Sequence, residues 1–252
     1  MGALSEEQLL VDFKNSLAEA EFRSESQGFL EETKQFRADG PNPAPEFAPK
    51  SVDEDKLADH EGWRDALAAK HWVAPHWPKE AGGAGPTSRE QAVLNEELSK
   101  AGVSDVGGFG TMMIDPTLLV HGSDEQKAEY LPKIVNAEIS WCQGWSEPAP
   151  GSDLASLQTR AIRDGDEYVV NGQKVWTSGA HHADRMSMLA RSDPDAPKHR
   201  GPFFLMFPMT DPGVTVRPLI QMTAAQISTK SSSNTFTCPS PTASAKKTAV
   251  GT

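Results

Sequence analysis

Residues Trp141 to Asp153, WCQGWSEPAPGSD, carry the first side chains whose types and spacing could do chemistry. Small, polar and aromatic residues are interleaved there, whereas a plain half-buried strand alternates polar and apolar side chains. Gly151 and Ser152 can bring backbone N–H groups close to an anionic ligand, as phosphate-binding turns do. An ordinary loop uses the same residue types. The dipeptide therefore predicts either a phosphate contact or a plain turn.

Lys174 to Ala180, KVWTSGA, form a second candidate, in which a hairpin tryptophan is followed by two hydroxyl groups. The indole of Trp176 can lie against a flat heteroaromatic ring, while Thr177 and Ser178 offer hydrogen bonds to the edge of that ring. The alternative is a tryptophan that closes a hairpin and packs in the core. Both interpretations stay open from this segment alone.

Thiol, imidazole and carboxylate groups add weaker candidates. Cys142 has no base that can be assigned to it, so a buried structural thiol is expected. His181 and His182 suggest a metal site, but adjacent residues of a strand point to opposite faces, which favours a loop role. Glu147 and Asp153 could act as general bases, and we expect them to fix the turn instead.

The composition excludes several classes of protein. The chain has 252 residues, with 24 Lys+Arg and 35 Asp+Glu, and a formal charge of −11 disfavours nucleic-acid binding. No apolar run approaches a membrane span, and acidic residues stand where a secretory signal has basic ones, so a cytoplasmic protein is predicted. The cysteines, Cys142 and Cys238, are too few for a disulfide framework and are not spaced for a metal site.

The first half of the chain has the pattern of helices. Ser5 and Gln8 are spaced as a capping box, and a Pro-rich stretch at residues 41–49 breaks the pattern. Helical spacing of apolar residues predicts helices at residues 5–17, about 52–70, 88–101 and 123–137.

After residue 138 the pattern becomes that of strands. Asp164-Gly165 and Asn171-Gly172 suit tight turns and predict an antiparallel meander. Further strands are predicted at residues 185–191, 203–209 and 214–219. The predicted fold class is α+β, with an all-helical N-terminal domain over residues 1–138 followed by an antiparallel β domain over residues 139–222.

The end of the chain has a different composition. Every acidic residue lies at or before Asp211, and residues 223–252 hold 13 Ser/Thr and three Lys. Such a segment has few apolar anchors, which predicts a disordered tail.

Roughly residues 60–222 resemble the acyl-CoA dehydrogenase family. The resemblance is carried by motifs in one order: HWPKE from His76, HGSDEQKAEYLPKI from His121, Ser-Glu-Pro at 146–148, Gly-Ser-Asp at 151–153, Gly-Asp-x-Tyr at 165–168, Asn-Gly-x-Lys at 171–174, Trp176, and FFLMFPMTDPGVTVRPL from Phe203. The family more often has Gly-Ala where this chain has Ala149-Pro150, and proline removes a backbone donor there.

The resemblance implies oxidation of Cα and Cβ of an acyl-CoA thioester, with FAD as the hydride acceptor. It implies an FAD site, whose residues by position are Gln143, Trp145 and Ser146 along the flavin, Gly151 and Ser152 at the pyrophosphate, Trp176 beside the isoalloxazine, and Thr177 and Ser178 near its N5. Ser152 would also meet the start of the CoA chain. Lys198 and Arg200 either approach the CoA phosphates or belong to a solvated loop.

An α C–H is acidic enough only when its thioester carbonyl is polarised and a carboxylate stands over the carbon. In the family this carboxylate is a Glu of a C-terminal helical domain, so we assign no catalytic residue in this chain. The resemblance also implies an electron-transfer flavoprotein as acceptor and a homo- or hetero-oligomer. An acyl-CoA oxidase, reoxidised by oxygen, and a non-catalytic partner subunit are the alternatives. The acyl group stays open.

The tail can be read in a second frame. When the frame moves back by one base, Gln226 to Pro239 can encode Asp-Phe-Asn-Glu-Val-Phe-Phe-Glu-His-Val-His-Val-Pro, and Ala245 to Gly251 can encode Gly-Glu-Glu-Asn-Arg-Gly-Trp. Both readings match what the family has there. We therefore hypothesise a single-base frameshift near Met222 to Ala225, which ends a longer enzyme before the C-terminal domain and makes Cys238 an accident of the shift.

Overall fold

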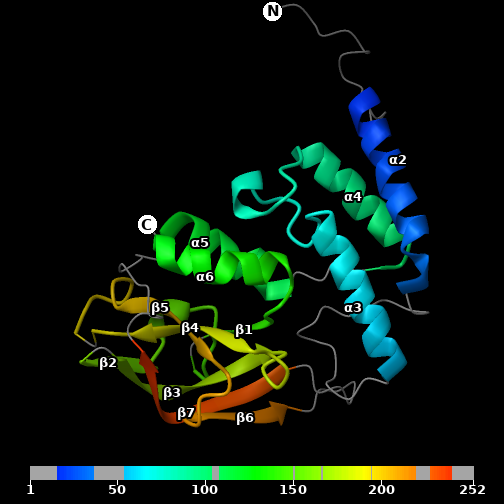
Figure 1. Ribbon diagram of the computed structural model, residues 1–252. Coiled ribbons are helices and arrows are strands. Elements are labelled where there is room, and N and C mark those ends of the chain that lie inside the picture. Colours follow the sequence, from blue (N-terminus) through cyan, green and yellow to red (C-terminus); the bar gives the residue numbers. More distant parts are fainter. Residues whose placement is uncertain are drawn as a thin grey trace, which may run out of the picture.

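A computed structural model describes residues 16–36, 54–103, 108–149, 151–165, 167–193, 195–219 and 228–239. A helical region precedes a β-sheet region, as expected of an α+β chain (Figure 1). The helical elements are α2 (Leu17–Glu32), η1 (Lys34–Phe36), α3 (Glu54–Ala69), η3 (Lys79–Ala81), α4 (Ser88–Lys100), the π-helix η4 (Gly110–Ile114), α5 (Asp115–His121), α6 (Asp124–Val135) and η5 (Leu154–Ser156). The strands are β1 (Trp141–Gly144), β2 (Arg160–Asp164), β3 (Glu167–Ser178), β4 (Arg185–Arg191), β5 (Pro202–Pro208), β6 (Val214–Leu219) and β7 (Ser228–Pro239).

Three helices fall where the sequence predicts them, namely α3, α4 and α6. The side chain of Ser123 caps α6 together with Gln126, as their spacing indicates. Helix α2 was not predicted, although Ser16 and Glu19 form the same kind of capping box at its start. Residues 5–15 of the first predicted helix and the Pro-rich break lie outside the described residues.

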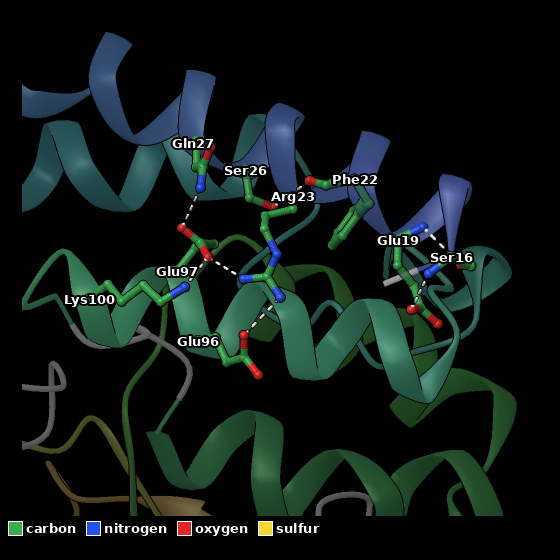
Figure 2. Close-up of polar contacts among 9 residues, drawn as sticks. All are labelled: Ser16, Glu19, Phe22, Arg23, Ser26, Gln27, Glu96, Glu97 and Lys100. Atoms are coloured by element: carbon green, nitrogen blue, oxygen red, sulfur yellow. Dashed lines mark hydrogen bonds and ion pairs between the residues drawn. The ribbon is translucent and has the colours of Figure 1, made fainter. Parts of the chain in front are cut away.

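Helices α2 and α4 are joined by a cluster of charged side chains (Figure 2). Arg23 of α2 donates to Glu96 at 2.8 Å and also to Glu97, both on α4. Glu97 is 4% exposed and accepts further hydrogen bonds from Gln27 at 3.0 Å and Lys100 at 2.7 Å. Because this buried carboxylate is fully hydrogen-bonded, it ties the two helices together.

A shared core joins helices α5 and α6 to the sheet over which they lie (Figure 1). Tyr130 of α6 packs edge-on against Trp141 of β1, with ring centroids 5.7 Å apart. Met206 of β5 belongs to the same buried cluster. Arg185 of β4 donates to the Tyr130 hydroxyl at 3.0 Å. The start of β1 is therefore fixed by the helical region.

The described strands form one seven-stranded sheet in the order β1-β4-β2-β3-β7-β6, with β5 pairing β4. Strands β4 and β6 have the predicted bounds, and β5 is shifted by one residue. The turn at Asp164-Gly165 is confirmed, since Gly165 has a φ of 61° between β2 and β3.

The second predicted turn, at Asn171-Gly172, is wrong. Both residues lie inside β3, at an irregularity in its pairing with β7. The glycine has another reason there, because a Cβ on Gly172 would lie 2.3 Å from Thr159 Oγ1. Close packing, rather than a tight turn, requires glycine at this position.

The tail prediction fails for residues 228–239, which form β7 between β3 and β6. This strand contains several Ser and Thr residues, and Thr favours extended backbone. Two flanking strands satisfy its backbone hydrogen bonds, which composition alone does not reveal. The rest of the predicted tail, residues 223–227 and 240–252, lies outside the described residues.

Among the described residues, no helix is long and apolar enough to cross a membrane.

Candidate functional site

The two segments that the sequence analysis singled out lie next to each other. The amide of Val175 in β3 donates to the carbonyl oxygen of Ser146, just after β1, at 2.9 Å. This bond brings Trp145 and Ser146 beside the stretch from Trp176 to Ser178. The fold therefore joins, across the sheet, residues that are some thirty positions apart in the sequence.

Trp176 has two unusual properties. Its φ is 60°, in the left-handed region that bulky residues rarely adopt, and its side chain is 64% exposed. It lies where the pairing of β3 with β7 shifts between Lys174 and Thr177, not at a hairpin end. The exposure excludes the alternative of a core tryptophan. A strained backbone that presents an exposed aromatic ring is typical of a functional site.

The neighbouring residues are less accessible. Thr177 is buried at 0% exposure, whereas Gln143, Trp145, Ser146 and Ser178 are half-buried. The indole Nε1 of Trp145 is buried and has no hydrogen-bond partner within the part of the chain that the structure describes. Such a group is uncommon in native proteins and calls for an acceptor.

Gly151 and Ser152 are exposed in the loop that follows Glu147. A Cβ on Gly151 would meet nothing within 4 Å, so protein packing does not require glycine there. Ser152 and Asp153 line a cavity of about 230 Å³ together with Leu189 and His199. The loop is open enough to admit a ligand, and the phosphate contact stays a prediction.

Asp153 is occupied by local contacts. It accepts hydrogen bonds from Lys198 Nζ and from Ser156 Oγ, each at 2.5 Å. The Lys198 bond, followed by that of Ser156, lowers the pKa of Asp153. A carboxylate with a lowered pKa is a weak base, so Asp153 fixes its turn, as expected. Lys198 therefore forms an ion pair with this carboxylate.

Glu147 also fixes a turn. Its carboxylate accepts the amides of Gln158 at 2.7 Å and Thr159 at 2.9 Å, and the ammonium of Lys174 at 2.8 Å. Burial acts to raise the pKa of Glu147, but the hydrogen bonds from Lys174 and Thr159 outweigh it and the pKa is lowered. No separate role of Lys174 was predicted from the sequence. The sequence nevertheless marks Lys174, because this residue ends the Asn-Gly-x-Lys motif.

The remaining candidates have structural positions. Cys142 is fully buried, with its Sγ 3.7 Å from Met209 Sδ, as expected of a structural thiol. His181 and His182 lie in a turn with ring centroids 3.8 Å apart, so the two rings pack against each other. The described residues include no group of three or more potential metal ligands.

Comparison with known proteins shows the family. A family model of the acyl-CoA dehydrogenase N-terminal domain matches residues 23–138, and one of the acyl-CoA dehydrogenase middle domain matches residues 142–233. Together the two models match most of the chain in the order found in the fold. The chain belongs to the acyl-CoA dehydrogenase family.

Individual relatives agree with this assignment. The chain is 37% identical over 210 residues to acyl-CoA dehydrogenase IpdE1 of Mycobacterium tuberculosis, covering 81% of this chain and 52% of the relative. The solved Tcur3481-Tcur3483 steroid ACAD is 32% identical with a TM-score of 0.74, covering 92% of this chain and 58% of that one. The ChsE4-ChsE5 complex of Mycobacterium tuberculosis is 32% identical with a TM-score of 0.70, covering 92% and 57%. The chain thus spans about half the length of the relatives that it matches.

Proposed function

We propose that this chain supplies the flavin-contacting and thioester-contacting parts of an FAD-dependent acyl-CoA dehydrogenase. The observation that carries the proposal is Trp176, exposed on a strained backbone beside Trp145 and Ser146. A flat ring can stack on this indole. Members of the acyl-CoA dehydrogenase family use FAD, which has such a ring.

The residues present fit this cofactor. The buried Nε1 of Trp145 lacks an acceptor among the described groups, and a ring nitrogen or carbonyl of a ligand would provide one. The open Gly151-Ser152 turn leaves backbone room for a pyrophosphate. Gln143, Ser146, Thr177 and Ser178 would line the ring edges.

The chemistry that FAD supplies when bound is acceptance of a hydride from Cβ, while the Cα proton leaves to a carboxylate base. This chain's residues would orient the ring and the thioester and exclude water from one side. We assign the base to a helical domain that is not among the described residues. The cytoplasm remains the proposed location and an electron-transfer flavoprotein the proposed acceptor.

The first test is FAD titration of the purified 252-residue chain, followed by quenching of flavin fluorescence. Stoichiometric binding that is weakened about tenfold in Trp176→Ala supports the proposal. No binding by the wild-type chain would contradict a flavin site in this polypeptide and would favour a non-catalytic partner subunit.

The substrate test uses acyl-CoA thioesters with straight-chain and steroid-bearing acyl groups. A steroid group belongs in this set because the 32% identical structure is titled a steroid ACAD. Binding of one class, measured by calorimetry with the FAD-loaded chain, would define the acyl group. Pull-down of a second, different subunit would support a hetero-oligomer, since the ChsE4-ChsE5 structure is a complex.

A further inference from the structure

Lys174 and Glu147 form a buried ion pair in the middle of the candidate site. The Lys174 side chain is 1% exposed and that of Glu147 is 5% exposed, with Nζ and Oε1 2.8 Å apart. Taking two charges out of water is costly, and apolar side chains of similar volume often replace such pairs without loss of stability. The pair therefore calls for an explanation other than stability alone.

Each member of the pair contacts backbone groups of a different segment. Lys174 Nζ, from β3, donates a second hydrogen bond to the Trp145 carbonyl oxygen at 3.0 Å. The Glu147 carboxylate accepts from the amides of Gln158 and Thr159, which precede β2. The two side chains thus connect β3, the end of β1 and the start of β2.

The side chain of Lys174 passes next to Gly144 of β1. A Cβ placed on Gly144 would lie 3.5 Å from Lys174 Cγ and 2.6 Å from Met186 Sδ. The close approach at Gly144 is to Met186, whereas the Lys174 stem lies at ordinary van der Waals distance from β1, and its Nζ reaches the carbonyl of the next residue, Trp145. The neighbouring Val175 amide then bonds to Ser146, and Trp176 follows with its positive φ.

We propose that the Glu147–Lys174 pair is a positioning element that couples the two flavin-contacting segments, residues 143–146 and 176–178. The pair holds the Trp145 carbonyl at a fixed distance from β3, so that Trp145 and Trp176 keep one relative geometry. An apolar pair fills the same space but cannot hold a carbonyl oxygen. The inference rests on the proposed FAD site.

The test compares three variants of the full chain with the wild type. Lys174→Met removes the ammonium and keeps the stem. Lys174→Met combined with Glu147→Gln also removes the uncompensated carboxylate and retains an acceptor for Gln158 or Thr159. Arg23→Met is the control, because it breaks a partly buried ion pair between α2 and α4.

Two properties are measured, the dissociation constant for FAD and the thermal unfolding midpoint. We expect Lys174→Met to weaken FAD binding at least tenfold, roughly the loss of one charge-assisted hydrogen bond. The double variant should recover most of the unfolding midpoint but not the affinity, whereas Arg23→Met should lower only the midpoint. Recovery of both properties in the double variant would mean that the pair is merely structural.

A second measurement separates failure of this proposal from failure of the FAD site. In the ligand-free chain, amide hydrogen exchange at Val175 reports on its hydrogen bond to the Ser146 carbonyl oxygen. Neither Val175 nor Ser146 is substituted in these variants. We expect exchange there to be several-fold faster in the double variant than in Arg23→Met at equal global stability. Equal exchange would overturn the coupling even if the wild type binds no FAD.

Discussion

At the scale of single residues, Trp176 combines an unfavourable backbone with an exposed ring. Asparagine tolerates the left-handed region, so Trp176→Asn should relieve strain of about 1–3 kcal/mol. The unfolding midpoint should stay constant or rise, while FAD affinity falls about tenfold because the stacking surface is lost. Calorimetric unfolding and FAD titration check the two effects. A large drop in the midpoint would indicate that the indole packs against the protein.

Asp115 is a second residue whose environment has a measurable consequence. It is 1% exposed at the start of α5, and Oδ1 has no hydrogen-bond partner among the described residues. Burial raises its pKa from 3.8 to about 8. The folded state therefore holds a proton that the unfolded state lacks, and stability decreases as pH rises through this window.

Asp115→Asn should consequently stabilise the protein at pH 7 by about 1–3 kcal/mol, because the asparagine side chain neither ionises in the unfolded state nor takes up a proton on folding. Near pH 3, below the ordinary pKa of 3.8, both side chains are largely neutral in the folded and unfolded states, so the difference should nearly vanish. Denaturant unfolding at the two pH values measures this. Identical differences at both would argue against a raised pKa.

At the scale of elements, the contact between α2 and α4 depends on a charged carboxylate. Burial acts to raise the pKa of Glu97, but the hydrogen bonds from Lys100, Gln27 and Arg23 outweigh it and lower the pKa from 4.5 to about 2. The ionised Glu97 therefore stabilises the folded state above pH 4.5, and this stabilisation is lost as pH falls toward 2.

Glu97→Gln should remove this pH dependence. We expect the wild type to be more stable at pH 6 by on the order of 1–2 kcal/mol, allowing for solvent screening of the partly exposed cations. The difference should shrink at low pH, which acid unfolding followed by circular dichroism can detect. A constant difference from pH 6 to pH 2 would assign the effect to packing.

Two glycines, one in strand β3 and one in helix α2, can be compared directly. Gly172 in β3 has no room for a Cβ next to Thr159, whereas Gly28 in α2 has nothing within 4 Å. Gly172→Ala should destabilise the protein by about 1–3 kcal/mol, and Gly28→Ala should stabilise it by about 0.5–1 kcal/mol. Urea unfolding of both variants measures the contrast. Equal effects would mean that β3 can move away from Thr159.

At the scale of the whole molecule, the reading-frame hypothesis predicts what the coding DNA contains. Sequencing from the codon of Arg217 through that of Thr252 should reveal one missing or extra base near Met222 to Ala225. The restored frame should encode a helical domain with a Glu base. A reading frame confirmed as it stands would contradict the hypothesis.

Strand β7 adds a constraint on this hypothesis. Its residues, Ser228–Pro239, pair with β3 and β6, and the middle-domain match extends to residue 233. The sheet thus accommodates a strand at this place in the printed frame, since backbone hydrogen bonding is indifferent to side-chain identity.

Local signals in the sequence by themselves determined much of the fold. Helical spacing located α4, and a capping box at Ser123 and Gln126 located the start of α6, because these signals act over a few neighbouring residues. The bounds of β4 and β6 also agree with the strands predicted from the sequence. The same short-range logic failed at Asn171-Gly172, where glycine is required by the close approach of Thr159, the residue before β2.

The sequence also identified most residues of the candidate site through their resemblance to one family, but not how these residues are held. Only the tertiary structure decided three features of the protein. Trp176 is exposed and strained, Lys174 reaches the Trp145 carbonyl, and residues 228–239 form a strand. The physical reason is that each depends on a partner remote in sequence, and a hydrogen bond or close contact with such a partner exists only once the sheet has formed.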